Sequence, residues 1–179
     1  LRCVIQVLRP MLGMNDGVYP RALAPLGELI AHDSQSCDFT SKAAIANSIE
    51  RAEPDIIVNA AAYTAVDSAE SEPEIAHKIN ALAPALLAQH AKRRNALLVH
   101  YSTDYVFDGS KQAPYIEADT TNPLSVYGAS KRSGEIAILE SGCRHLIFRT
   151  SWVFATRGHN FAKTILRLAK EKEVLRVVA

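Results

Sequence analysis

The feature that most constrains the fold of this chain is a regular alternation of short apolar runs with longer segments of helical spacing. Strands alternating with helices of roughly ten or more residues pair in parallel through right-handed crossovers. We therefore predict an α/β fold with a doubly wound parallel sheet. The predicted strands are Val4–Leu8, Leu29–Ala31, Asp55–Asn59, Ala96–Ser102, His145–Thr150 and Leu175–Val178. The predicted helices are Ser41–Arg51, Ser71–Arg94, Val126–Glu140 and Asn160–Lys172.

The second of these helices opens on Ser71-Glu72-Pro73-Glu74, which has the form of a capping box. In such a box the serine hydroxyl accepts a hydrogen bond from a free backbone N–H at the start of the helix. We therefore expect one long helix that begins at this serine.

Polar segments follow four of the predicted strands. They are Asp33, Asn59–Thr64, Ser102–Asp104 and Thr150–Trp152. Ligands of doubly wound sheets bind at the carboxyl ends of the strands. We expect these distant segments to converge on one cleft.

The composition excludes several classes of function. The chain has 20 basic and 19 acidic side chains and a formal net charge of +1, which gives no electrostatic case for binding nucleic acid or an anionic membrane. No apolar run approaches the roughly 20 residues of a membrane span. Cys3, Cys37 and Cys143 lie far apart, and no cysteine or histidine pair has zinc-ligand spacing. We expect a soluble protein without a metal site in a reducing cytoplasm.

Tyr127 and Lys131 form a Y-x-x-x-K pair on a predicted helix. Positions four apart share one helix face, so the ammonium can lie near the phenol and lower its pKa from about 10 toward neutrality. Roughly 0.3 such pairs are expected by chance, and on most surface helices the pair has no chemistry. The hydroxyls of Ser102 and Thr103 strengthen the interpretation of this pair as a chemical site. They end a predicted strand, and they can bind a substrate oxygen or hold the phenol in place. By themselves, such hydroxyls more often terminate a strand and cap a turn.

Several longer motifs then point to a family. They are Ser102–Gly109 (STDYVFDG), Pro123–Gly128 (PLSVYG) with Lys131, Arg149–Phe154 (RTSWVF), Pro54–Asp67 (PDIIVNAAAYTAVD) and Ala69-Glu70. Together they resemble the extended short-chain dehydrogenase/reductases, and among these the dTDP-4-dehydrorhamnose reductases, from about Arg21 to the end of the chain. The resemblance implies a Rossmann-like NAD(P)-binding domain over residues 1–179. It also implies NADPH- or NADH-dependent reduction of the C4 keto group of dTDP-4-dehydro-L-rhamnose to dTDP-L-rhamnose, a precursor of cell-surface polysaccharide.

The resemblance assigns catalytic and substrate roles position by position. Tyr127 would protonate the C4 carbonyl oxygen, and Lys131 would hold the nicotinamide ribose and lower the pKa of the phenol. Thr103 would hydrogen-bond the reacting oxygen, with Asp104 beside it in the sugar site. Trp152 would contact the substrate; the alternative is an ordinary core aromatic.

The resemblance also assigns the cofactor-binding residues. Asp33 would accept a hydrogen bond from the adenosine ribose, and Asp38 and Phe39 would flank the adenine. No arginine follows Asp33 closely to pair with a 2′-phosphate, which favours tolerance of NADH. The cofactor would pass over the turn of Ala62, Tyr63 and Thr64, although a tight turn alone would explain the alanines equally well.

The chain departs from the family pattern at both ends. The family opens with a G-x-x-G-x-x-G turn that holds the pyrophosphate, whereas Leu12–Pro20 has only Gly13 and Gly17, with Asp16 between them. Family members also continue beyond the length of this chain. We therefore expect an atypical first ~20 residues, a substrate domain missing after residue 179, and no reductase activity in the chain as written. The resemblance allows a magnesium ion and a homodimer, and the sequence shows a site for neither.

Two alternative functions stay open at this point. One is another nucleotide-sugar epimerase or dehydratase, although dehydratases typically carry an acidic pair after the strand-end threonine, and only Asp104 follows Thr103 here. The other is a non-catalytic binding subunit, like the regulatory subunit of methionine adenosyltransferase, which the Arg149–Trp152 segment disfavours. Structural or solvated roles are expected for the histidines, which are His32, His77, His90, His100, His145 and His159.

Overall fold

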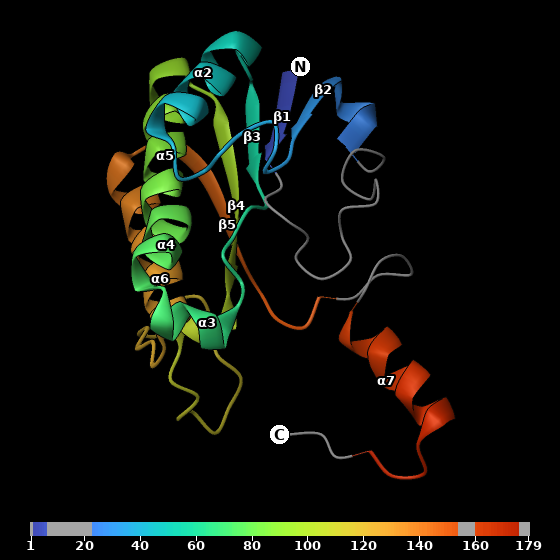
Figure 1. Ribbon diagram of the computed structural model, residues 1–179. Helices are drawn as coiled ribbons and strands as arrows, with labels where there is room; N and C mark the ends of the chain where they lie inside the picture. The colour runs from blue at the N-terminus through green and yellow to red at the C-terminus, as the bar shows by residue number, and fades with distance from the viewer. Residues whose placement is uncertain (1, 7–22, 154–159, 176–179) are drawn as a thin grey trace.

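A single parallel sheet organises the protein. The structure is a computed structural model that describes residues 2–6, 23–153 and 160–175. Its five strands lie in the order β2-β1-β3-β4-β5, with every neighbouring pair parallel (Figure 1). The strands are β1 (Arg2–Gln6), β2 (Glu28–His32), β3 (Ile56–Asn59), β4 (Leu97–Thr103) and β5 (Arg144–Thr150). The predicted α/β class with a parallel sheet is confirmed.

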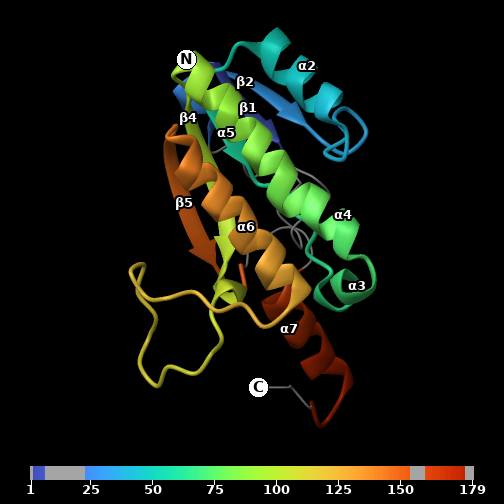
Figure 2. The same cartoon turned by 90° about the vertical axis from the view of Figure 1, so that its left-hand side faces the viewer.

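A layer of helices covers one face of the sheet. In Figures 1 and 2, α2, α4, α5 and α6 lie side by side on this face, whereas α7 stands apart from them. The helices are α2 (Lys42–Ala52), α3 (Val66–Ser71), α4 (Pro73–His77), the π-helix η2 (Lys78–Leu82), α5 (Ala83–Arg94), α6 (Val126–Ser141) and α7 (Phe161–Glu171). Two short 3-10 turns, η1 (Ala24–Leu26) and η3 (Asp104–Val106), complete the described elements. None of the described helices is long and apolar enough to cross a membrane.

The hydrophobic core lies between the sheet and this helical layer. Ile57 of β3 and Leu98 of β4 belong to one buried cluster with Ile49 of α2, Leu87 of α5 and Ile138 of α6. Each of these five side chains is fully buried. Burial of one such side chain stabilises a fold by about 1.5–3 kcal/mol, so the cluster fixes the helices to the sheet.

Two of the predicted helices match the structure closely. Ser41 and Ser125 are the N-caps of α2 and α6, and their hydroxyls accept hydrogen bonds from Ala44 N and Gly128 N. The predicted helix Asn160–Lys172 is likewise confirmed as α7, with the Asn160 side chain as its cap.

The long helix predicted from Ser71 to Arg94 is confirmed from Pro73 to Arg94, where α4, η2 and α5 follow one another without a break, but its predicted start is wrong. Helix α3 ends at Ser71, Glu72 is non-helical, and Pro73 starts α4, from which η2 and α5 continue. The hydroxyl of Ser71 donates to Ser68 O, and no side chain caps α4, so the capping-box interpretation is also wrong. The physical reason is the proline, which lacks an N–H and disfavours helical geometry in the residue before it.

The predicted strands agree with the structure in the middle of the chain and less well at its start. The first strand was expected at Val4–Leu8, and the structure places β1 at Arg2–Gln6. Residues 7 and 8, the altered turn Leu12–Pro20 and residues 176–178 of the predicted last strand lie outside the described residues. The assignment of residues 1–179 to one cofactor-binding domain stays a prediction.

Candidate active site

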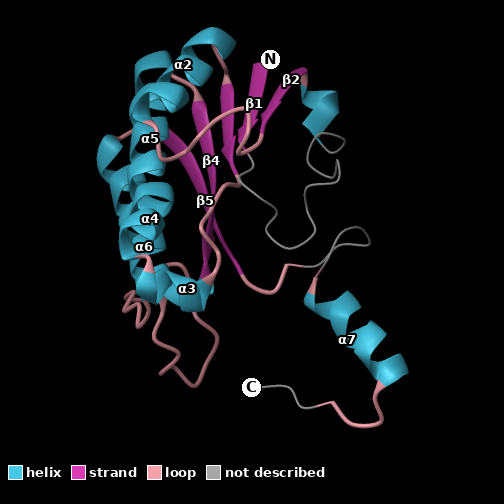
Figure 3. Cartoon of the chain, in the orientation of Figure 1, coloured by secondary structure: helices cyan, strands magenta, loops and turns pink. Residues whose placement is uncertain are grey.

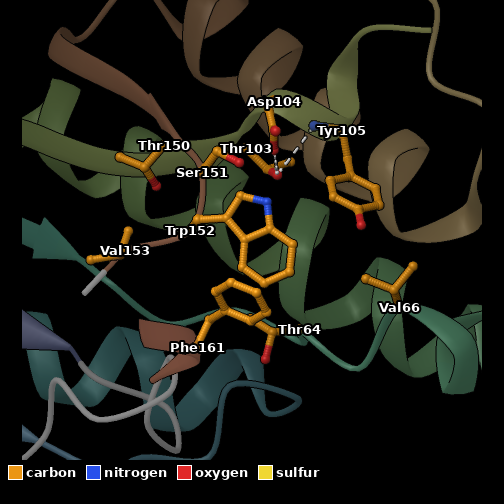
Figure 4. A pocket seen from close by; sticks show the side chains of 10 residues that line it. All are labelled: Thr64, Val66, Thr103, Asp104, Tyr105, Thr150, Ser151, Trp152, Val153 and Phe161. Carbon is orange, nitrogen blue, oxygen red and sulfur yellow. Dashed lines mark hydrogen bonds between the residues drawn. The ribbon is translucent and has the colours of Figure 1, made fainter. Parts of the chain in front are cut away.

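The carboxyl ends of β3, β4 and β5 open onto a common cavity. Figure 3 shows these strand ends at the edge of the sheet that faces α7, and Figure 4 shows the cavity from close by. Its volume is about 240 Å³, and its lining residues are Thr64, Val66, Thr103, Asp104, Tyr105, Thr150, Ser151, Trp152, Val153 and Phe161. Three of the four predicted segments therefore converge. Asp33, at the end of β2, is not among the lining residues.

Thr103 occupies the centre of this edge. Its side chain is 4% exposed, its Oγ1 donates to Asp104 Oδ1 at 3.1 Å, and it accepts from Tyr105 N at 3.2 Å (Figure 4). The hydroxyl thus caps η3, as the structural alternative for this residue expects, and it also faces the cavity.

The start of α6 is pressed against η3. A Cβ on Gly128 would lie 2.3 Å from Tyr105 O, so only glycine fits at this position. The N–H of Val126 donates to Glu70 Oε1 at 2.8 Å, which ties the helix start to α3. These contacts bury Tyr127 with its ring edge-on to Tyr105, at 5.5 Å between centroids.

The pKa of Tyr127 differs from the sequence expectation. Burial raises the pKa of the phenol, and a hydrogen bond with Thr103 offsets only part of this effect. The predicted lowering of this pKa is therefore wrong for this structure, because burial is the largest effect on the phenol. A raised pKa leaves the phenol protonated at neutral pH and makes it a weaker acid than a free tyrosine.

Lys131 is fully buried between α6 and the sheet. Its Nζ donates to Tyr101 O at 2.7 Å and lies 3.5 Å from His100 Nε2. The second nitrogen of that imidazole, Nδ1, accepts from Asn59 Nδ2 at 3.0 Å. Burial lowers the pKa of Lys131 to about 8, against the raising effect of Glu135. It also lowers the pKa of His100 well below its usual range, and the charge of Lys131 adds to this.

Sequence reasoning missed Asn59 and His100 as individual site residues. A signal for His100 was present in β4, where Leu98, His100 and Ser102 are the inward-facing positions of the alternating pattern. A polar side chain between two such positions is buried under the helix that carries Lys131.

A charged cluster anchors α6 to β5 behind Lys131. The Glu135 carboxylate is 1% exposed and accepts two hydrogen bonds from Arg149, at 2.9 and 2.8 Å, and one from Arg132 at 3.0 Å. Burial raises the pKa of Glu135, but the hydrogen bonds and charge of Arg149 together with the bond from Arg132 outweigh it, so the pKa lies below its usual range. The arginine of the RTSWVF motif is thus a structural residue.

Asp33 ends β2 as an exposed carboxylate. Its Oδ1 accepts from Gln35 N at 3.0 Å, Ser36 N at 2.9 Å and Ser36 Oγ at 2.8 Å, and the bonds from Ser36 are the main reason that its pKa is lowered. These bonds form a turn and all fall on one oxygen, so Oδ2 of this exposed carboxylate accepts none of them.

Asp38 lies at the surface of the protein, and its neighbour Phe39 lies in the core. Asp38 is exposed, and its Oδ1 accepts from both N and Oγ1 of Thr40 at 2.8 Å. Phe39 is 4% exposed and belongs to the core cluster, and the predicted placement of the pair beside an adenine ring stays a prediction.

The turn of Ala62, Tyr63 and Thr64 is held by the π-helix. Tyr63 N donates to Asn80 Oδ1 at 2.8 Å, and Asn80 Nδ2 donates back to Tyr63 O at 3.0 Å. The Tyr63 hydroxyl donates to the Glu72 carboxylate. The turn after β3 is therefore fixed in shape.

Trp152 forms one wall of the cavity. It adopts a left-handed backbone with φ of 46°, it is 69% exposed, and its ring lies 4.5 Å from the ring of Phe161 (Figure 4). The alternative of an ordinary core aromatic is wrong. An exposed indole at a cavity is available for contact with a ligand.

The part of the chain that the structure describes holds no group of three or more His, Cys, Asp or Glu side chains that could bind a metal ion. The expected magnesium thus finds no candidate site among these residues.

Residues 19–179 match the RmlD substrate binding domain. The chain belongs to the RmlD family. It is 55% identical over 162 residues to the dTDP-4-dehydrorhamnose reductase of Escherichia coli strain K12, an alignment that covers 88% of this chain and 54% of that relative. The chain spans about half the length of the curated relatives that it matches.

Solved structures of the family agree with the fold. A dTDP-4-dehydrorhamnose reductase from Clostridium acetobutylicum superposes with a TM-score of 0.87 at 35% identity, covering 98% of this chain and 62% of that one. The enzyme from Bacillus anthracis, solved in complex with NADP, gives a TM-score of 0.86 at 34% identity, covering 96% of this chain and 61% of that one.

Proposed function

We propose that this protein reduces the C4 keto group of dTDP-4-dehydro-L-rhamnose with NADPH or NADH. The observation that supports the proposal is the contact of Thr103 with Tyr127 beside the end of β4, together with the bond of the buried Lys131 to Tyr101 O of the same strand, in a chain of the RmlD family. The names of the relatives and the NADP in the Bacillus anthracis structure support the substrate and the cofactor.

The described residues fit a nicotinamide dinucleotide. Lys131 has three N–H donors and a single close acceptor, Tyr101 O, so it has donors for ribose hydroxyls. Asp33 ends β2 as an exposed carboxylate, one oxygen of which accepts none of the bonds of its turn, and a ribose diol binds at this position in such sheets. The segment expected to hold the pyrophosphate lies outside the described residues.

A bound nicotinamide would supply the hydride at this site. Tyr127 would donate its phenolic proton to the carbonyl oxygen, and burial keeps that proton on the phenol until it is needed. Thr103 would turn its hydroxyl from Asp104 to the same oxygen and hold it in place. The ammonium of Lys131 would bind the hydroxyls of the nicotinamide ribose.

The cavity walls suit a deoxysugar. Trp152 and Phe161 offer an apolar surface to the C6 methyl group, and Asp104 and Ser151 offer hydrogen-bond partners for hydroxyls. We also propose that the protein is located in the cytoplasm and assembles as a homodimer. Both proposals are supported by the family alone. Analytical ultracentrifugation tests the dimer.

The test is NADPH oxidation with dTDP-4-dehydrorhamnose, followed by absorbance, in a purified version of this chain extended by the remaining length of a curated relative, because no turnover is expected of the chain as written. We expect turnover that falls at least about 100-fold in Tyr127→Phe. Tyr115→Phe, which changes a phenol outside the cavity, is the matched control and should retain turnover. Binding of NADPH without oxidation would overturn the proposal in favour of a binding subunit, and a C4 epimer without net oxidation would indicate an epimerase.

A further inference from the structure

A buried pair of polar side chains lies beneath Lys131. Asn59 and His100 are register partners on β3 and β4, and both are fully buried. Their hydrogen bond of 3.0 Å joins Asn59 Nδ2 to His100 Nδ1. The imidazole extends this pair to Lys131, whose Nζ lies 3.5 Å from Nε2.

The backbone fixes which way the Asn59 amide points. Ala61 N donates to Asn59 Oδ1 at 3.1 Å, so the amide oxygen faces the turn after β3. The NH₂ group must then face His100, whose Nδ1 acts as the acceptor. Because burial keeps the imidazole neutral, its one proton lies on Nε2.

In this tautomer the imidazole offers no hydrogen-bond acceptor to Lys131. The Nε2–H group and the ammonium are both donors, and their separation of 3.5 Å exceeds the usual 2.7–3.2 Å of a hydrogen bond. The carboxylate of Glu135, on the same helix, is engaged by Arg149 of β5 and by Arg132. Tyr127, the other titratable group of α6 near this site, is a protonated phenol. Tyr101 O therefore stays the one close acceptor among the described contacts of Lys131.

We propose that Asn59 and His100 are positioning residues for Lys131. The amide locks the imidazole in the tautomer that cannot accept from the ammonium, so that Lys131 directs its remaining donors at the hydroxyls of a bound ribose. The inference rests on the proposed function, in which Lys131 binds the nicotinamide ribose. It adds a reason why a fully buried lysine keeps donors for a ligand instead of using them within the protein.

The first measurement needs neither activity nor ligand. A two-bond ¹H–¹⁵N correlation spectrum of the histidine-labelled protein reports which imidazole nitrogen carries the proton, and loss of a signal in His100→Phe assigns it. We expect a neutral ring protonated at Nε2 from pH 6 to 8. A proton on Nδ1, or on both nitrogens, overturns the proposal.

The second measurement reverses the tautomer. In Asn59→Asp both side-chain oxygens are acceptors, so Nδ1 becomes the protonated nitrogen and Nε2 becomes free to accept from Lys131. We expect the Kd of NADPH to rise about tenfold, the loss of one hydrogen bond to a charged group. Asn47→Asp adds the same charge at an exposed position of α2 and should leave the Kd unchanged.

The two measurements separate the inference from the function on which it rests. An unchanged Kd in Asn59→Asp, with the imidazole shifted to the Nδ1–H form, overturns the positioning role while the proposed function stands. Wild-type protein that fails to bind NADPH overturns both, and the tautomer is still read from the first spectrum. If Asn59→Asp does not fold, the wild-type spectrum alone can still refute the proposal that Asn59 holds His100 in the Nε2–H tautomer.

Discussion

Asn80 on the π-helix donates a hydrogen bond of 3.0 Å to Ser130 Oγ on α6, across 50 residues of sequence. Ser130 Oγ in turn donates to Tyr127 O at 2.8 Å, so the bond reaches the backbone of the proposed proton donor. The same amide holds the turn at Tyr63. Asn80 therefore sets the spacing between the cofactor-side turn and the helix that carries Tyr127 and Lys131.

Close contact between these helices predicts that Gly134→Ala destabilises the protein. A Cβ at residue 134 would lie 2.2 Å from Asn80 O, a backbone atom that cannot turn aside. We expect a loss of about 1–3 kcal/mol in the free energy of unfolding, measured by urea denaturation. Ser133→Ala, one position away and less buried, is the control. Equal stability of the two variants would show that α6 shifts without cost.

The ion pair behind Lys131 predicts an acid-sensitive contribution to stability. Glu135→Gln leaves Arg149 without its carboxylate and should cost about 3 kcal/mol at pH 7, as loss of one partner from a buried pair typically does. Because the pKa of Glu135 is lowered in the folded state, its contribution is present above the unfolded pKa and is lost as pH falls through the folded value.

Urea denaturation of wild type and Glu135→Gln from pH 7 to pH 3 tests this prediction. The stability difference should shrink toward acid pH, whereas Glu140→Gln, at an exposed position of α6, should show little difference at any pH. If the difference in the free energy of unfolding between wild type and Glu135→Gln does not change with pH, Glu135 is not ionised in the folded protein as assigned.

Burial of Lys131 predicts opposite pH dependences for the stability of the protein and for its affinity for NADPH. Its pKa of about 8 lies below the usual 10.5, so between these values the unfolded chain holds more protons than the folded protein. The stability of wild type relative to Lys131→Met should therefore rise with pH across this range. Affinity for NADPH should instead fall above pH 8, because the ammonium is lost.

The variant Lys131→Met should bind NADPH about tenfold more weakly at pH 7 and lose the affinity change near pH 8. Fluorescence titration measures the Kd, and Lys42→Met, at an exposed position of α2, is the control. An affinity that is the same in wild type and Lys131→Met would remove the lysine from the cofactor site.

Asp33 predicts a cofactor preference. A 2′-phosphate would meet the charge of its carboxylate, so Asp33→Ala should raise the ratio of NADPH affinity to NADH affinity, by about tenfold if the full repulsion is removed. Titrations of wild type and of Asp33→Ala with NADPH and with NADH give the ratio. Asp67→Ala, an exposed acid on α3, is the control, and an unchanged ratio in Asp33→Ala would place the ribose elsewhere.

The sequence predicts the sheet well because its strands are short, apolar and separated by strong helical patterns. The convergence of Thr103 and Trp152 also follows from topology, since the ends of parallel strands meet at one edge. The break at Glu72 was readable in principle from Pro73, and the capping-box pattern obscured it. The π-helix could not be foreseen, because it depends on packing of Asn80 against Tyr63 and Gly134 rather than on local spacing.

The electrostatics of the site could not be predicted from spacing alone. The four-residue interval correctly places Tyr127 and Lys131 on one helix, but the direction of each pKa depends on burial. Burial exceeds the opposing effect of the Thr103 hydrogen bond at Tyr127 and of the Glu135 charge at Lys131. The alternating pattern of β4 marks His100 as a buried position, but its pairing with Asn59 depends on strand register, which no sequence pattern displays.

The parallel register of the sheet has a consequence for how the protein acquires its site. Thr64, Thr103 and Trp152 come together only when β3, β4 and β5 have all paired, and each of those pairings closes a long loop of chain. Contacts between residues so distant in sequence form late in folding, since the entropy of loop closure must be overcome first. The ability to bind a ligand at this cavity should therefore appear only after both pairings have formed, and ligand binding during refolding reports the completion of this part of the sheet.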